Sequence, residues 1–218
     1  VFFQNDANRT VFADKNIGGK RYALVKGSGV NLEEFSRMEF PPKKDSIRFI
    51  WVARIAKMKG IDIFLEAAER VKTKYPQTEF RVLGFIEEDY KEKMREYENR
   101  KIIDYRGMQQ DVRPDLEESQ CLILPSEAEG MSNACLEAAA CGRALITTDV
   151  PGCRECVADG ITGYLIQPGS VEDLTEKIEK FICLPYNERK HMGEMGREKM
   201  EQEFSRETVV DAYMQEIK

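Results

Sequence analysis

Two glutamates eight positions apart, Glu129 and Glu137, could bind the hydroxyl groups of a ligand, because carboxylates accept hydrogen bonds from hydroxyls. Before them, the apolar run over 121–124 ends at Pro125, and an alanine-rich stretch follows Ser132. This order predicts a strand, a loop and a helix. The free N–H groups at the start of a helix favour an anion such as phosphate. Phosphate at the helix start with sugar hydroxyls beside it describes a nucleotide-sugar site.

Two cations, Arg54 and Lys59, lie between a predicted strand over 47–53 and a predicted helix that begins near Ile61. Both therefore belong to a loop at the carboxyl edge of the sheet, where open α/β sheets bind ligands. There, the arginine fork and the lysine ammonium would neutralise a diphosphate. Alone, they could equally be surface cations. Together with the two glutamates, they predict one cleft rim on which all four groups converge.

Other residues at this edge have two possible roles. Ser132 and Asn133 could cap the helix, contact a ligand, or do both. Gly84 and Gly107 end predicted strands, where a glycine permits either a turn or the close approach of a ligand. Neither a G-x-G-x-x-G sequence nor a Walker A lysine is present, so dinucleotide and nucleoside-triphosphate sites lose support.

Strand and helix patterns alternate about six times after residue 46. The runs are short and apolar with little alternation, which is typical of strands buried on both faces. We therefore predict an α/β fold, a doubly wound parallel sheet of Rossmann-like type. The predicted strands span 1–3, 22–26, 47–53, 80–83, 102–105, 121–124, 144–147 and 164–166. The predicted helices span 8–16, 61–75, 87–98, 111–118 (capped by Asp111), 132–141, 187–202 and 206–217, and one more starts at Ser170.

Composition narrows the classes of function. The 218 residues carry a net charge of −6, which argues against a nucleic-acid polymer as partner. Cys121, Cys135 and Cys183 lie in or at the end of apolar patterns and are interpreted as small core residues. Cys153 and Cys156 form a C-x-x-C without the second ligand pair of a zinc site, which favours incidental thiols and no metal site. Reduced thiols suit the cytoplasm, our expected location.

These motifs resemble the C-terminal domain of the retaining family 4 glycosyltransferases of GT-B architecture. The similarity rests on the 52–60 segment, on Leu124-Pro125-Ser126 with Glu129-Gly130 and Glu137-Ala138, and on the segments 151–155 and 159–166. In that family a glutamate, seven residues and a second glutamate recur. The resemblance covers roughly residue 27 to the C-terminus, in the same order.

The resemblance implies a role for each candidate residue. Arg54 and Lys59 would bind the diphosphate and stabilise it as the leaving group. Glu129 would hold the transferred sugar, and Glu137 the ribose hydroxyls. Backbone N–H groups of Gly130, Met131, Ser132 and Asn133 would contact sugar and phosphate, and the base would stack near Gly107 and Met108. No cofactor or metal is required, which fits the absence of a D-x-D motif.

The resemblance also implies that this chain is the C-terminal half of a GT-B fold. Residues 1–26 would be a remnant of the N-terminal acceptor domain and the crossing linker, 27–204 the nucleotide-sugar domain, and 205–218 a helix that packs toward the absent half. The whole enzyme would be bacterial, would use a UDP-sugar for polysaccharide or glycoconjugate biosynthesis, and could work at the inner face of the membrane on a lipid-linked sugar. We expect this chain alone to bind donor weakly and to be inactive in transfer.

Two alternatives stay open. A GT-B nucleotide-sugar 2-epimerase would need added histidine and carboxylate groups near the cleft, whereas the single histidine, His191, lies in a charged segment that predicts an exposed helix. A non-catalytic α/β nucleotide-binding module would assign no role to the four charged candidates Arg54, Lys59, Glu129 and Glu137.

Overall fold

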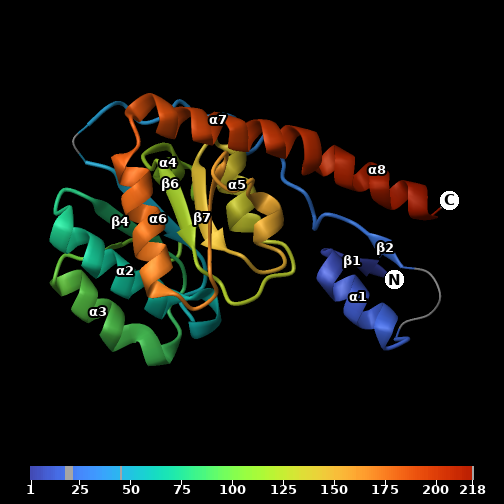
Figure 1. The fold of residues 1–218 in the computed structure, drawn as a ribbon, viewed down its shortest axis with the longest axis horizontal. Coiled ribbons are helices and arrows are strands. Elements are labelled where there is room, and N and C mark those ends of the chain that lie inside the picture. Colours follow the sequence, from blue (N-terminus) through green and yellow to red (C-terminus); the bar gives the residue numbers. More distant parts are fainter. Residues whose placement is uncertain (18–21, 45, 218) are drawn as a thin grey trace.

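The computed structural model describes residues 1–17, 22–44 and 46–217, which form a large sheet domain and a smaller unit beside it (Figure 1). Six parallel strands build the sheet in the order β5-β4-β3-β6-β7-β8. The chain moves outward from β3 to β5, returns to β6 beside β3, and continues the other way. The β3/β6 boundary is therefore the topological switch point, where such sheets form a ligand crevice. The strands are β3 (Arg48–Val52), β4 (Glu79–Leu83), β5 (Asp104–Tyr105), β6 (Cys121–Leu124), β7 (Ala144–Thr148) and β8 (Gly163–Ile166).

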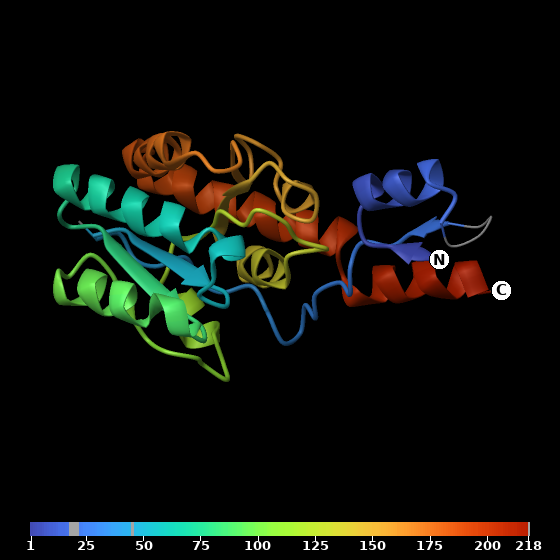
Figure 2. The same cartoon turned by 90° about the horizontal axis from the view of Figure 1, so that it is seen from below.

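Helices lie above and below the strands (Figure 2). Helix α2 packs against α6, and α5 packs against α7. This arrangement confirms the predicted doubly wound α/β fold. The helices are α2 (Ile61–Lys74), α3 (Lys91–Asn99), α4 (Arg113–Glu117), α5 (Asn133–Ala140), α6 (Val171–Cys183), α7 (Tyr186–Glu203) and α8 (Arg206–Ile217), with 3-10 turns η1 (Lys57–Lys59), η2 (Glu88–Tyr90) and η3 (Arg154–Cys156).

The core is aromatic around β3. Phe49 stacks on Phe80 with ring centroids 5.3 Å apart, and Trp51 packs against Phe64 at 5.1 Å. All four side chains are buried. Strand β3 is central in the sheet and has neighbours on both sides and both faces, which explains its continuous apolar run.

The smaller unit consists of β1 (Phe2–Phe3), α1 (Asp6–Asp14) and β2 (Ala23–Leu24), and α8 lies beside it (Figures 1 and 2). Strands β1 and β2 pair in parallel, and the ring of Phe2 lies 4.7 Å from that of Tyr213 on α8. The predicted division at residues 26 and 204 stays a prediction, and residues 18–21 of its first part lie outside the described residues.

Two local predictions are wrong. The cap residue of α4 is Val112, whereas Asp111 lies one position earlier and its carboxylate accepts a hydrogen bond from the Arg113 N–H. Cys183 is exposed at the end of α6, because the apolar pattern ends on the solvent side there. The other two thiols interpreted as core residues, Cys121 and Cys135, are buried.

A buried arginine fastens the segment before β3 to the sheet. The Arg143 guanidinium donates to the carbonyls of Glu39, Ser119 and Cys141 at 2.7, 3.1 and 3.2 Å, and burial lowers its pKa to about 10. In Arg143→Met these carbonyls lose their donor, so we expect the free energy of unfolding to fall by about 3 kcal/mol in urea denaturation. The matched change at an exposed position, Arg95→Met, should cost under about 0.5 kcal/mol. Equal losses in both variants would contradict this account.

Candidate functional site

The loops that follow β3 and β6 meet at the switch point. The Lys59 Nζ lies 2.6 Å from Glu129 Oε1, and the Ser126 hydroxyl donates to the same oxygen at 2.9 Å. The two charged side chains are 24% and 12% exposed, so the pair is half-buried yet open to a ligand. One early cation and one late carboxylate therefore meet at this edge, and they are two of the four groups that the sequence predicts on one cleft rim.

Backbone contacts hold these loops together. Gly60 has a φ of +73°, and a Cβ added there would lie 1.9 Å from the carbonyl oxygen of Pro125. The Glu127 N–H donates to the Met58 carbonyl at 2.9 Å. A side chain at residue 60 would force the loops apart. The glycine thus permits the approach that brings Lys59 to Glu129.

At the start of α5 some backbone N–H groups donate to protein acceptors and others do not. Ser132 is its cap residue, with a hydroxyl that accepts from the Cys135 N–H, and its own N–H donates to the Gly152 carbonyl at 2.9 Å. In the described part of the chain, the N–H groups of Gly130 and Met131 donate to no protein atom. These two N–H groups remain available to an anion, whereas that of Ser132 does not.

Arg54 lies apart from the Lys59–Glu129 pair. Its Nη1 lies 3.2 Å from Glu87 Oε1, and its side chain is 56% exposed. It borders a cavity of about 250 Å³ between the ends of β3 and β4 and the loop after β5. Met108 lines this cavity and is 75% exposed. The remaining lining residues are mostly apolar: Val52, Ala53, Leu83, Gly84, Phe85, Gln109 and Val112.

The mostly apolar lining of this cavity suits a flat ring that stacks on side chains. Of the predicted pair Gly107–Met108, only Met108 lines the cavity. The carbonyl of Gly107 accepts a hydrogen bond from the Gly84 N–H at 2.9 Å. Sequence reasoning missed Phe85, although an apolar residue directly after a strand-ending glycine is a usable signal. It also missed Glu87, because the partner of Arg54 follows the next strand.

Glu137 belongs to a second, smaller cavity of about 60 Å³, lined also by Ser28, Asn31, Asn133 and Arg206 among others. Its carboxylate has no hydrogen bond or ion pair within the described residues. Burial, and then the negative charge of Glu34, raise the pKa of Glu137 to about 7. An acceptor-only group without a partner is poised to bind a hydroxyl donor.

The raised pKa of Glu137 predicts a pH-dependent stability. Between pH 4.5 and about 7 the folded chain keeps a proton on Glu137 that the unfolded chain has released. The free energy of unfolding therefore falls as pH rises through this window, and the loss is complete above pH 7. In Glu137→Gln this dependence should disappear, and stability at pH 8 should rise by about 1–2 kcal/mol after allowance for partial solvent exposure.

Urea denaturation of both proteins at pH 5.5 and pH 8 measures this effect. The exposed Glu127→Gln change on the neighbouring loop serves as the control. A Glu137→Gln variant that keeps the wild-type pH dependence would rule out Glu137 as its source.

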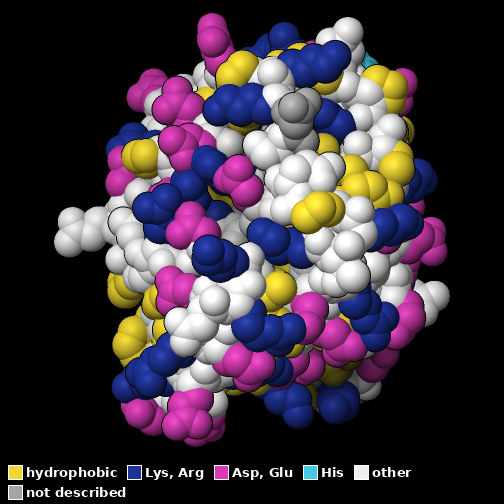
Figure 3. Space-filling model, turned by 90° about the vertical axis from the view of Figure 1, so that its left-hand side faces the viewer, with side chains coloured by type: hydrophobic (Ala, Val, Ile, Leu, Met, Phe, Trp, Pro, Cys, Tyr) yellow, Lys and Arg dark blue, Asp and Glu magenta, His cyan; other side chains and the backbone are white. Residues whose placement is uncertain are grey.

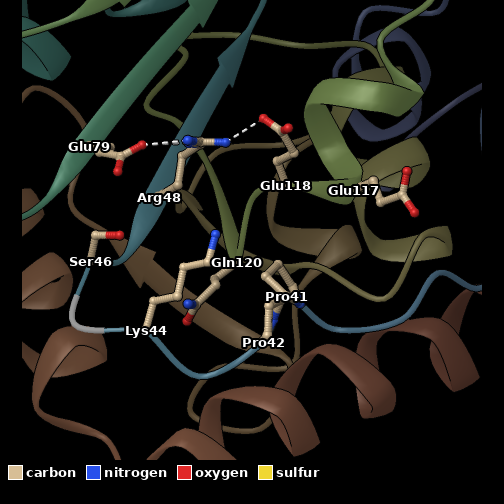
Figure 4. Close-up of a pocket in the computed structure, with 9 residues that line it drawn as sticks. All are labelled: Pro41, Pro42, Lys44, Ser46, Arg48, Glu79, Glu117, Glu118 and Gln120. Atoms are coloured by element: carbon tan, nitrogen blue, oxygen red, sulfur yellow. Dashed lines mark hydrogen bonds and ion pairs between the residues drawn. The ribbon is translucent and has the colours of Figure 1, made fainter.

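A pocket of about 260 Å³ opens at the other edge of the sheet, near the amino ends of the strands (Figure 4). Arg48 lies between Glu79 and Glu118 there and forms ion pairs with both. Charges that are already paired, at the edge away from the switch point, make this pocket a poor candidate for the site. The side of the molecule shown in Figure 3 mixes cationic and anionic side chains and displays no basic patch.

No group of three or more His, Cys, Asp or Glu side chains among the described residues could hold a metal ion. Cys153 and Cys156 are buried, and the Cys156 thiol lies 3.9 Å from the Met131 sulfur. His191 lies on α7 with its side chain 69% exposed, as predicted. None of the helices within the described ranges is both long and apolar enough to cross a bilayer.

Residues 33–199 match the sequence profile of the family described as glycosyl transferases group 1. The chain belongs to this family. The sequence-based resemblance to the C-terminal GT-B domain of family 4 glycosyltransferases is thereby confirmed.

Among curated relatives of this chain, the N,N'-diacetylbacillosaminyl-diphospho-undecaprenol alpha-1,3-N-acetylgalactosaminyltransferase of Campylobacter jejuni is 26% identical over 191 residues. The match covers 83% of this chain and 50% of the relative. The N-acetyl-alpha-D-glucosaminyl L-malate synthase of Bacillus anthracis is 37% identical over 111 residues, which cover 50% of this chain and 28% of that protein. The chain spans about half the length, or less, of the curated relatives it matches.

Solved structures share the fold. Anabaena HepE in complex with UDP and glucose superposes with a TM-score of 0.84 at 16% identity, over 100% of this chain and 62% of HepE. TarM of S. aureus, in a complex that includes UDP, gives a TM-score of 0.82 at 19% identity, over 99% of this chain and 43% of TarM.

Proposed function

We propose that this chain is the donor-binding half of a retaining glycosyltransferase that uses a UDP-sugar. The main support is the Lys59–Glu129 pair, which lies at the switch point beside two N–H groups that have no partner among the described residues. A cation and free N–H groups suit a diphosphate, and a carboxylate next to them suits the hydroxyls of the attached sugar. HepE and TarM, with UDP in their structures, support uracil as the base.

Two cavities and the Lys59–Glu129 pair at this edge suit the four parts of the donor: base, ribose, diphosphate and sugar. The apolar cavity beside Arg54 and Met108 would take the base, and the carboxylate of Glu137 the ribose hydroxyls. Lys59 would bind the diphosphate, and Glu129 would hold the transferred sugar. Arg54 would leave Glu87 to reach the phosphates, since its exposed ion pair is weak.

In the reaction we propose, the bond between the anomeric carbon and the diphosphate oxygen breaks, an acceptor hydroxyl bonds to that carbon on the same face, and the hydroxyl proton passes to the departing diphosphate oxygen. Negative charge grows on the departing UDP. Lys59, Arg54 and the N–H groups of Gly130 and Met131 would stabilise this charge, which lowers the barrier by electrostatic complementarity. No step of this proposal uses a metal or a cofactor.

The acceptor and the rest of the enzyme lie outside this chain in our proposal. An N-terminal domain of the same polypeptide would bind the acceptor, so the 218 residues alone should transfer no sugar. The name of the C. jejuni relative includes an undecaprenol-linked acceptor, which supports a lipid-linked sugar at the inner face of the membrane. The product would enter polysaccharide or glycoconjugate synthesis. A 2-epimerase is less favoured, because His191 lies exposed on α7.

Thermal unfolding with UDP, GDP, ADP and uridine tests donor binding. A ligand that binds only the folded chain raises its melting temperature, so UDP should give the largest rise of the four. No shift with any nucleotide would overturn the proposal, and a larger shift with GDP or ADP would change the donor. Sugar transfer by the isolated chain would disprove its predicted inactivity.

A further inference from the structure

One buried side chain, Asn5, joins the smaller unit to the loop that precedes α5. It is 2% exposed, although most residues around it on α1 are exposed. Its Oδ1 accepts from the Asn8 N–H at 2.9 Å and so caps α1. Its Nδ2 donates to the carbonyl of Gly130 at 3.0 Å. The amide therefore makes one bond within the smaller unit and one bond across to the candidate site.

The bond across the boundary fixes the orientation of a peptide plane. In a trans peptide the C=O and the N–H point in opposite directions. A Gly130 carbonyl that points at Asn5 therefore turns the Met131 N–H away from Asn5. No protein acceptor for this N–H exists among the described residues, and the same holds for the N–H of Gly130. The next N–H, of Ser132, is held by the Gly152 carbonyl, so this peptide is fixed on its C-terminal side as well.

The backbone of Gly152 packs beside the Gly130 carbonyl, but among the described residues it is Asn5 that donates a hydrogen bond to it. Glycine has the widest choice of backbone angles, and Gly130 is exposed. The side chain of Gln4 also lies over Gly130, since a Cβ at residue 130 would lie 2.4 Å from its Oε1, but it makes no hydrogen bond to the loop. Gln4 therefore covers the loop, whereas Asn5 orients it.

We propose that Asn5 is a positioning residue that aims the Met131 N–H at the phosphates of the donor. The proposal rests on the proposed function, because it assumes a nucleoside diphosphate at this loop. It also makes donor binding depend on the smaller unit: when the unit moves away, the Gly130–Met131 plane is released and an anion donor is lost. Asn5 touches no substrate and acts only through Gly130.

The test is Asn5→Ser in the 218-residue chain, with UDP and uridine titrated separately. Serine is as good a helix cap as asparagine, so α1 keeps its cap, but its short side chain does not reach the Gly130 carbonyl. We expect the Kd for UDP to rise about fivefold to tenfold, which corresponds to one lost hydrogen bond. The Kd for uridine, which lacks phosphate, should stay unchanged. The control Gln4→Ala should leave both values unchanged.

A second measurement needs no ligand. If Asn5 orders the loop, amide hydrogen exchange of Ser132 should be several-fold faster in Asn5→Ser, and α1 should keep its protection. Asn5→Asp, which also retains a cap but cannot donate, should behave alike and covers the case in which the serine variant folds poorly.

The outcomes separate the two proposals. Unchanged UDP affinity in Asn5→Ser, an equal loss of UDP and uridine affinity, or unchanged Ser132 exchange would overturn the role of Asn5. A wild-type chain that binds neither UDP nor uridine would overturn the proposed function, while the exchange data would still report whether Asn5 orders the loop.

Discussion

Lys59→Met should weaken UDP binding by about 100-fold, which is about 2.7 kcal/mol. Two effects add. The diphosphate loses its charge-assisted hydrogen bond, and the Glu129 carboxylate, which is 12% exposed, is left without its cation beside the phosphates. Calorimetric titration with UDP measures the change. If the affinity for UDP is too low to fit directly, a nucleotide that binds more tightly is titrated into protein that holds UDP, and displacement gives the UDP affinity.

The matched control is Lys57→Met. Lys57 lies on the same turn, η1, and is exposed. Its loss should change UDP affinity less than about threefold, because an exposed charge near the site acts only through solvent. Equal losses of UDP affinity in both variants would show that UDP is attracted by general positive charge. An unchanged UDP affinity in Lys59→Met would show that Lys59 is not part of the site.

The double variant Lys59→Met with Glu129→Gln separates the two effects. Neutralising Glu129 removes the uncompensated carboxylate, so the double variant should bind UDP more tightly than Lys59→Met alone. Together with the Glu129→Gln single variant this completes a double-mutant cycle, which gives the coupling between the two side chains; for groups in contact it is about 0.5–3 kcal/mol. Strict additivity would mean that the 2.6 Å pair has no influence on the nucleotide.

Gly60→Ala should lower the free energy of unfolding by about 3 kcal/mol or more and abolish UDP binding. Its φ of +73° disfavours any side chain, and the added Cβ would lie 1.9 Å from the Pro125 carbonyl oxygen, a backbone atom that cannot rotate away. The loops after β3 and β6 must separate to admit it. Lys59 and Glu129 then lose contact, so stability and binding fail together.

Gly169→Ala is the matched control for backbone strain. Its φ of +78° is nearly the same, but a Cβ there meets no atom within 4 Å. We expect a cost of about 1 kcal/mol from the left-handed conformation alone, with UDP affinity unchanged. Urea denaturation and UDP titration of both variants measure the difference. If Gly60→Ala costs no more than Gly169→Ala, contact with Pro125 is not what holds the two loops together.

The sequence alone determined the fold class and the edge of the sheet that carries the candidate site. Apolar runs of four or five residues, such as Cys121–Leu124, are local signals of buried parallel strands, and in such a sheet every loop after a strand lies on the same edge. That rule suffices to bring Lys59 and Glu129 to one edge. The same rule places the loop residue Met108, which follows a predicted strand, on this edge.

The tertiary structure decided which of these groups meet. Strand order is non-local, and only the placement of β6 beside β3 turns two residues 70 positions apart into a 2.6 Å pair. Tertiary packing also pairs Arg54 with Glu87 and places Glu137 in a separate cavity. It brings the Asn5 amide within hydrogen-bond distance of the Gly130 carbonyl. Periodicity reports how one element faces the core, whereas such pairings depend on packing between elements distant in the chain.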